Sequence, residues 1–277
     1  MNKPNHLPAT VPPSGGALTT TPGTQRIATR MADDLLAVAH SRERALAAQR
    51  RYRIGQYEFR EADHEQIQRW ARMLGIEPEA VVVGLEKRIW FMNQADVNFH
   101  VQDGHIISLA WDFDTFPLAD WAWGDGLKIE RLGILKTKNG RLPTLPRCLR
   151  VLNCAECELT TLDLTPMPGL TYLGCWVNQL TDLDLTPVPG LTTLSCWANQ
   201  LTDLDLTPVP GLTTLSCSDN QLTDLDLTPV PGLTALYCSH NQLTDLDLTP
   251  VPGLRSIWCG KHVRLTNAPC NLEVIRK

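Results

Sequence analysis

Several features that would assign a function directly are missing from this chain of 277 residues. It lacks the G-x-S-x-G, G-x-x-x-x-G-K and H-E-x-x-H motifs of nucleophilic, phosphate-binding and zinc-dependent enzymes, and its histidines form no ligand motif. No run of eighteen apolar residues occurs, and residues 1–25 contain no apolar stretch of signal-peptide length. We therefore expect no cofactor, no bound metal, no membrane span and no enzyme activity, with the first half of the chain left open on the last point.

Basic side chains are scarce in the second half of the chain. Residues 149–277 contain 6 lysines and arginines against 13 aspartates and glutamates, whereas residues 1–148 contain 19 and 17. Proteins bind phosphate groups through surfaces rich in lysine and arginine. Nucleic acid is therefore not expected as the ligand of the second half.

The second half does contain a repeat of 21 residues with the form L-x-x-L-x-C-x-x-N-x-L-T-x-L-D-L-T-P-x-P-G. A sixth unit departs from this pattern after Cys259. A fixed period in the twenties predicts a solenoid, because one unit alone cannot bury its apolar face. The six units begin at Leu149, Leu170, Leu191, Leu212, Leu233 and Leu254.

Within one unit the residue types predict a strand, a turn and an extended return. In "LTTLSCW", Leu194 and Cys196 alternate with outward-facing residues, which is the period of two expected of a short parallel strand with one buried face. Two prolines in "TPVPG" exclude a regular helix on the opposite side. Between the strand and the proline segment of each unit lies an asparagine, whose side-chain amide can hydrogen-bond to the backbone of the neighbouring coil and so form a ladder. These residues are Asn178, Asn199, Asn220 and Asn241.

This spacing resembles the leucine-rich repeat of bacterial proteins, with cysteine at a position where leucine is usual. The resemblance covers nearly half of the chain. It implies an α/β leucine-rich repeat solenoid of parallel strands without regular convex helices, and "IERLGILKTKNGRLPTLPRC" is expected to be its degenerate first coil. The family includes secreted effectors with a ubiquitin-ligase domain after the repeats. Here "CGKHVRLTNAPCNLEVIRK" is expected to be a cap, so ligase activity is not expected.

Two further columns repeat with the units. Six cysteines face inward, at Cys154, Cys175, Cys196, Cys217, Cys238 and Cys259, and we interpret them as small buried hydrophobes, with disulfides or a metal as the alternative. Aspartates form the other column, for which turn formation is favoured and calcium is the alternative. They are Asp163, Asp184, Asp205, Asp226 and Asp247, flanked by Asp182, Asp203, Asp224 and Asp245.

The outward strand positions differ between units while the framework stays constant, and they are expected on the concave side. Aromatic residues gather there in two groups, separated by serine and threonine. Exposed aromatic groups are common anchors of protein interfaces, although they could also stack to stabilise the sheet or be covered by another part of the chain. The predicted partner-binding residues are Tyr172, Trp176, Trp197, Asp219, Tyr237, His240 and Trp258.

The expected organisation has three parts. Residues 1–25 are rich in proline, glycine, threonine and serine and should be a flexible tail, residues 26–128 an α-rich domain, and residues 129–277 the solenoid with its caps. In the middle part, "DHEQIQRWARMLGIEPEAVVVGLEKRIW" predicts two helices with a break at Gly75 and Pro78 in the first turn of the second.

This helix pair resembles a helix-turn-helix. Its second helix, "PEAVVVGLE", is apolar and acidic at the positions where base-reading side chains would be needed, so a small helical core is favoured over DNA binding. The following "VNFHVQDGHIISLAW" predicts a hairpin that turns at Asp103 and Gly104 and leads towards the solenoid.

Taken together, the sequence predicts a protein-binding adaptor or recognition subunit that acts through the concave aromatic face. One alternative is an effector or regulator whose activity, DNA binding included, resides in the N-terminal domain, with the repeats as a targeting element. The other is a structural subunit of a larger assembly. A cytoplasmic location is expected, with a translocated effector as the alternative.

Overall fold

The computed structural model describes residues 36–38, 40–42, 45–46, 49–86, 99–112, 126–137 and 140–276. The chain divides into two units, Met1–Gln49 and Arg50–Lys277. In the first unit, the described residues between 36 and 46 are helical. The tail expected at residues 1–25 lies outside the described residues.

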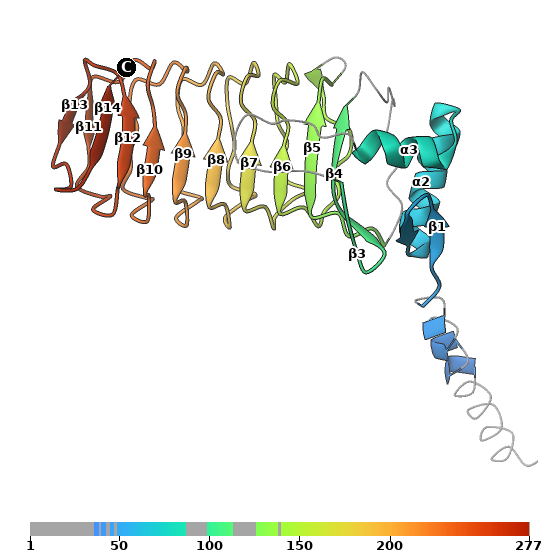
Figure 1. Ribbon diagram of the computed structural model, residues 1–277. Helices are drawn as coiled ribbons and strands as arrows, with labels where there is room; N and C mark the ends of the chain where they lie inside the picture. Colours follow the sequence, from blue (N-terminus) through green and yellow to red (C-terminus); the bar gives the residue numbers. More distant parts are fainter. Residues whose placement is uncertain are drawn as a thin grey trace, which may run out of the picture. The chain divides into compact units, whose positions relative to one another are not determined.

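The second unit is built on a ten-stranded sheet in the order β14-β12-β10-β9-β8-β7-β6-β5-β4-β3 (Figure 1). Strands β3 and β4 pair antiparallel, and the other neighbours in this sheet pair parallel. The prediction of one short parallel strand per repeat is confirmed. The strands are β3 (His100–Gln102), β4 (His105–Asp112), β5 (Arg131–Leu135), β6 (Val151–Asn153), β7 (Tyr172–Gly174), β8 (Thr193–Ser195), β9 (Thr214–Ser216), β10 (Ala235–Tyr237), β12 (Ser256–Cys259) and β14 (Glu273–Arg276).

The repeats stack in register, so that each buried position lies beside its own copy in the next unit. Leu194 of β8, for example, pairs with Leu173 of β7 and Leu215 of β9. The leucines, cysteine and valine of each unit point into the space behind the sheet and are buried. A single continuous core therefore runs along the solenoid, as expected for units that cannot bury their apolar faces alone.

The return side of each repeat consists of turns, without a regular helix in residues 149–253. Prolines fix the backbone there and remove donors that a helix would need. The predicted solenoid of parallel strands without regular convex helices is confirmed.

An asparagine ladder ties adjacent coils together, as predicted. Asn220 Oδ1 accepts from Leu201 N–H at 3.0 Å, and Asn220 Nδ2 donates to the carbonyls of Cys196 and Cys217 at 3.0 and 3.1 Å. Leu201 and Cys196 belong to the preceding coil, so the side chain bridges backwards along the chain. Equivalent bonds occur at Asn178, Asn199 and Asn241.

At the N-terminal end, the degenerate coil expected around Arg131–Leu135 is present as β5, and its residues Ile129, Leu132 and Ile134 are buried. The predicted hairpin is also present as β3 and β4. The sequence did not indicate that β4 would pair in parallel with β5 over five residue pairs and thereby extend the sheet.

The two predicted helices are α2 (Glu61–Leu74) and α3 (Pro78–Glu86), and α2 ends at Gly75, whose φ is 68°. They follow a hairpin of β1 (Tyr52–Ile54) and β2 (Tyr57–Phe59). Trp70 of α2 packs on Trp111 of β4, with ring centroids 4.9 Å apart, and both rings are buried. The helix pair is therefore anchored to the first parallel strand of the sheet.

The C-terminal end continues the strand pairing beyond the last repeat. Strand β11 (Asp245–Asp247) pairs in parallel with β13 (Arg264–Thr266), and β14 pairs with β12. Arg276 Nη1 donates to the carbonyls of Gly260, Lys261 and Val263, at 3.3, 3.3 and 2.8 Å. This guanidinium ties the final strand to the loop before β13.

Candidate functional site

The outward side of β7–β10 forms the candidate binding surface, which we call the strand face. Each strand contributes two outward residues and a third that follows the strand. None of the twelve is charged, although 20% of the chain is. The residues of the strand face are Tyr172, Gly174 and Trp176; Thr193, Ser195 and Trp197; Thr214, Ser216 and Ser218; and Ala235, Tyr237 and Ser239.

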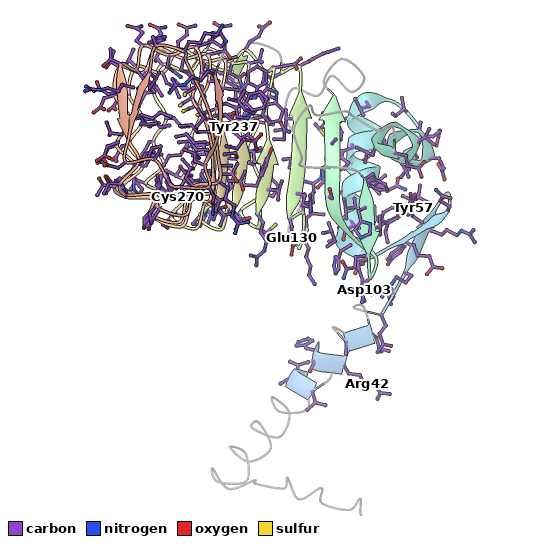
Figure 2. All side chains as sticks on the ribbon, turned by 60° about the vertical axis from the view of Figure 1, so that its left-hand side comes forward. Arg42, Tyr57, Asp103, Glu130, Tyr237 and Cys270 are labelled. Atoms are coloured by element: carbon purple, nitrogen blue, oxygen red, sulfur yellow. The ribbon has the colours of Figure 1, made fainter. Side chains whose placement is uncertain are left out.

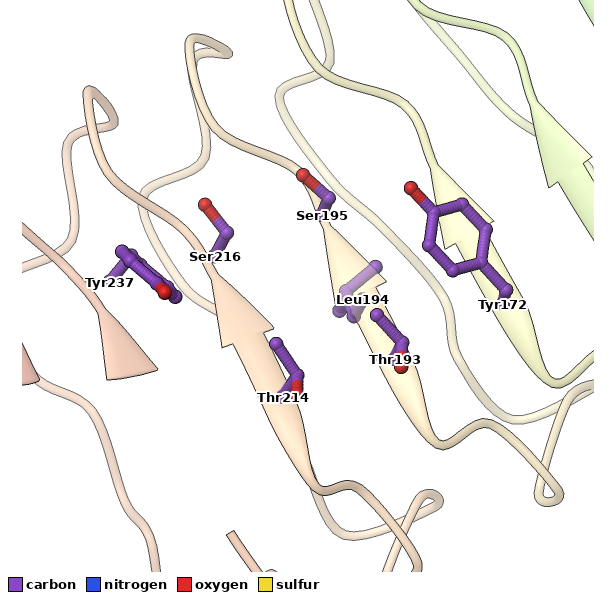
Figure 3. A pocket seen from close by; sticks show the side chains of 7 residues that line it. All are labelled: Tyr172, Thr193, Leu194, Ser195, Thr214, Ser216 and Tyr237. Atoms are coloured by element: carbon purple, nitrogen blue, oxygen red, sulfur yellow. The ribbon is translucent and has the colours of Figure 1, made fainter. Parts of the chain in front are cut away.

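A pocket of about 130 Å³ lies on the strand face between two tyrosines (Figure 3). Tyr172 of β7 and Tyr237 of β10 form its walls, and the smaller side chains of β8 and β9 lie between them. The small residues are Thr193, Ser195, Thr214 and Ser216, and the buried Leu194 lies beneath them. Because neighbouring parallel strands lie roughly 4.8 Å apart, the two walls are separated by about three such spacings.

Within this pocket the polar groups are neutral hydroxyls. Burial raises the pKa of Tyr172 to about 12, so its phenol stays protonated at neutral pH. Ser195 is 5% exposed, and its Oγ has no hydrogen-bond partner. An unpaired buried hydroxyl is unusual in a folded protein and calls for a ligand or water as its partner.

Trp176 and Trp197 lie side by side, as their repeat positions predicted. Their rings are nearly parallel, at an interplanar angle of 8° with centroids 6.4 Å apart. Trp176 is only 1% exposed, so the expectation that it lies exposed is wrong. Its ring lies over Gly174, where a Cβ atom would collide with it. Trp197 is half-buried and keeps part of its ring accessible.

The second aromatic group is Tyr237 with Trp258 of the next coil. Their ring centroids are 5.5 Å apart at an interplanar angle of 49°, and both residues are half-buried. Tyr237 therefore forms one side of the pocket, and its ring also contacts the ring of Trp258 on β12. The two predicted aromatic groups are separate, with the hydroxyl residues of β8 and β9 between them.

Asp219 and His240 occupy equivalent positions just beyond the strands. Both are exposed, and both have a positive φ of 54°. Val177 and Ala198 adopt the same conformation in the preceding coils, at 51° and 53°. The position is therefore a fixed left-handed turn that places Asp219 and His240 at the rim of the strand face.

A family model described as leucine-rich repeats (2 copies) matches residues 189–229 and 210–250. The match falls on the units whose in-register parallel strands and asparagine ladder are described above. The repeats are leucine-rich repeats. Solenoids of this kind commonly bind proteins on the surface that their strands present.

Solved structures of bacterial leucine-rich repeat proteins are similar to this chain. YopM, a leucine-rich effector protein from Yersinia pestis, is 31% identical over 54% of this chain and 43% of its own, with a TM-score of 0.47. InlJ from Listeria monocytogenes, whose functional domain includes a cysteine ladder, is 28% identical over 51% of this chain and 41% of its own, with a TM-score of 0.31. This chain thus spans less than half of either protein. No curated protein matches it.

The cysteines of the leucine-rich repeats are buried in one column, and the thiols are free. Burial raises the pKa of Cys175, Cys196 and Cys217 well above the ordinary value, so these thiols stay protonated and unreactive. Cys148 and Cys270 are exposed, the latter at the C-terminal end of the solenoid (Figure 2). Among the described residues, no group of three or more histidine, cysteine or acidic side chains could hold a metal ion.

Five of the nine repeat aspartates form turns, as the favoured interpretation predicted. Asp226 Oδ1 accepts from the backbone N–H of Thr228 at 2.8 Å, and hydrogen bonds from Thr228 lower the pKa of Asp226. The same bond occurs at Asp163, Asp184, Asp205 and Asp247. This geometry accounts for these five aspartates without a metal ion.

In the N-terminal region, the exposed residues of α3 are apolar or acidic. Helix α3 buries Val81, Val82 and Leu85, and its first turn carries an acidic residue. Beside it, the buried Asp63 of α2 accepts from Ile106 N–H of β4 at 2.9 Å and lies 2.9 Å from His105 Nδ1. Burial raises the pKa of Asp63, and these two partners oppose that shift. The described residues contain no helix long and apolar enough to span a membrane.

Proposed function

We propose that this leucine-rich repeat chain is an adaptor or recognition subunit that binds a protein partner through the strand face. The contacts come from Tyr172, Trp197 and Tyr237, with Trp258 extending the surface and Asp219 and His240 at its rim. Trp176 supports Trp197 by stacking rather than by contacting the partner.

The observation that carries this proposal is the composition of the strand face. Interfaces are enriched in tyrosine and tryptophan at their centres and depleted in lysine, glutamate and aspartate. Tyrosine with serine is also the combination that antibody binding sites use, because tyrosine gives rigid contact area and small hydroxyls adapt to many partners. The strand face combines these residue types without a charged residue.

A site-specific crosslink tests the proposal in the full chain. A photoreactive amino acid replaces Ser216 in the pocket, or Gln221, an exposed residue of the same repeat that lies off the strand face. We expect a protein adduct from native lysate with the probe at position 216 and none at 221. A second substitution, Thr214→Arg, should abolish the adduct because it places an unpaired charge in the pocket. Adducts from position 221 alone, or adducts that survive Thr214→Arg, would move the binding surface elsewhere.

A further inference from the structure

We propose that the pocket between Tyr172 and Tyr237 is an anchor site that receives one tyrosine side chain of the protein partner. This inference rests on the proposed function and specifies the chemical group that the partner inserts. Three properties of the pocket lead to it: its size, its lack of charge, and an unpaired hydroxyl in its wall.

The size of the pocket fits a single ring. Its volume is about 130 Å³. An internal cavity of ~150 Å³ holds one benzene molecule in another protein. The tyrosine rings on both sides can pack with an inserted ring in offset or edge-to-face arrangements. One ring-bearing side chain therefore fills the space, whereas a helix or a larger group would not enter it.

The pocket favours a neutral group. Its seven lining residues are uncharged, and so are the other residues of the strand face. A lysine, arginine, aspartate or glutamate entering the pocket would lose water without gaining an opposite charge, which is unfavourable. Charged side chains of the partner are therefore directed to the rim, where Asp219 and His240 are exposed.

The unpaired hydroxyl of Ser195 favours a ring with one polar atom. Ser195 lines the pocket, and its Oγ is buried without a partner. A serine hydroxyl turns about a single side-chain torsion and can either donate or accept a hydrogen bond. A phenol supplies such a partner at the tip of its ring, whereas phenylalanine leaves the hydroxyl unpaired.

A sugar ring fits this pocket less well than a phenol. Sugars carry hydroxyl groups around the whole ring edge, and each one needs a partner when it is buried. Between the tyrosine rings, Thr193 and Thr214 contribute methyl groups beside their hydroxyls. A ring with an apolar body and a single polar atom matches this distribution.

An NMR titration of the full chain with three small probes tests the inference. The probes are p-cresol, toluene and methyl glucoside, which represent tyrosine, phenylalanine and a sugar. We expect p-cresol to shift the signals of Thr193, Thr214 and Ser216 and to bind roughly 5- to 10-fold more tightly than toluene, the effect of about one buried hydrogen bond. The glucoside should not bind detectably.

Two serine variants make the test specific. Ser195→Ala should remove the preference for p-cresol over toluene and leave the unfolding midpoint nearly unchanged, because the hydroxyl has no partner to lose. Ser239→Ala is the matched control, since Ser239 is also buried with an unpaired Oγ but does not line the pocket. It should keep the preference.

Equal binding of p-cresol and toluene, tighter binding of the glucoside, or no binding by any probe would overturn the tyrosine assignment. So would a preference for p-cresol that persists in Ser195→Ala. These failures are distinct from failure of the proposed function. A partner adduct at position 216 without any preference for p-cresol leaves protein binding in place and removes only the tyrosine anchor.

Discussion

Replacing Asn220 by alanine should destabilise the middle of the solenoid by about 2–4 kcal/mol. The side chain is 8% exposed and makes hydrogen bonds to two adjacent coils. Its loss leaves the buried Leu201 N–H without a partner, which costs about 1–3 kcal/mol, and weakens the contacts of two further carbonyls at about 0.5–1 kcal/mol each. These contributions overlap, so the stated total is smaller than their maximum sum.

Urea unfolding followed by circular dichroism measures this loss of stability, and amide hydrogen exchange locates it. We expect faster exchange at Leu201 in Asn220→Ala and an unchanged slope of unfolding free energy against urea. The control is Gln221→Ala, an exposed side chain in the same repeat, which should change stability by less than about 0.5 kcal/mol. A loss below about 1 kcal/mol in Asn220→Ala would refute the ladder argument.

A charge variant at the same position separates hydrogen bonding from packing. Asn220→Asp keeps an acceptor for Leu201 N–H but places a buried carboxylate against carbonyl oxygens that now receive no hydrogen bond. It should destabilise the protein at neutral pH at least as much as alanine does. If Asn220→Asp is as stable as the parent protein, the amide donors contribute nothing to the ladder.

Three other perturbations test different parts of the molecule. Hydrogen bonds lower the pKa of Asp247 to about 2, so its contribution to stability is present above pH ~4 and is lost as the pH falls through 2. In urea titrations between these pH values, the stability of Asp247→Asn should depend less on pH than that of the parent protein. An unchanged pH dependence would contradict this. Gly174→Ala should displace the ring of Trp176, red-shift the tryptophan fluorescence and lower the free energy of unfolding by about 1–3 kcal/mol. Gly211→Ala, where a Cβ atom meets only ordinary contacts, should have none of these effects. Asp63→Ala leaves the buried backbone N–H of Ile106 in β4 unpaired and should lower the free energy of unfolding by about 2–4 kcal/mol in thermal unfolding. A smaller loss of stability than in a control variant at an exposed residue would show that water replaces the carboxylate.

The repeat framework could be predicted from the sequence because every unit contains the same information. Alternation in "LTTLSCW" set the strand, the prolines excluded a convex helix, and the 21-residue period set the register. Buried positions recur at the same offsets in each copy, so an error in one unit would conflict with the others. The asparagine and aspartate roles followed from the same logic, since both residue types hydrogen-bond to nearby backbone.

The sequence was less informative wherever a side chain depends on a particular neighbour. Trp176 occupies the same repeat position as Trp197, yet its ring is buried over Gly174, the last residue of β7. The glycine was visible in the sequence as the one residue without a side chain at its repeat position, where the other units have asparagine, serine, tyrosine or tryptophan. Strand β4 was missed as part of the sheet because it has no 21-residue counterpart.

The pocket was missed as a unit because no single repeat contains it. Its walls come from β7 and β10 and from two different outward positions, while the residues between them come from β8 and β9. Both tyrosines could be predicted from their aromatic character, but in the sequence the intervening serines and threonines only separate the two aromatic groups. Their small size is what leaves room for a ligand between the rings.

Comparison of two adjacent repeats shows where function can reside in such a chain. The units that begin at Leu191 and Leu212 differ only at Trp197 versus Ser218 and at Ala198 versus Asp219. Both pairs lie at the end of a strand, in or beside the strand face, and none of the core leucines or turn aspartates changes. A residue that is the same in each unit stabilises the packing of one unit on the next. Because it recurs in each unit, it cannot distinguish one part of the surface from another. Among the residues that line the pocket, only Tyr172 and Tyr237 differ from their counterparts in these two units, so these two side chains distinguish this part of the surface from its neighbours.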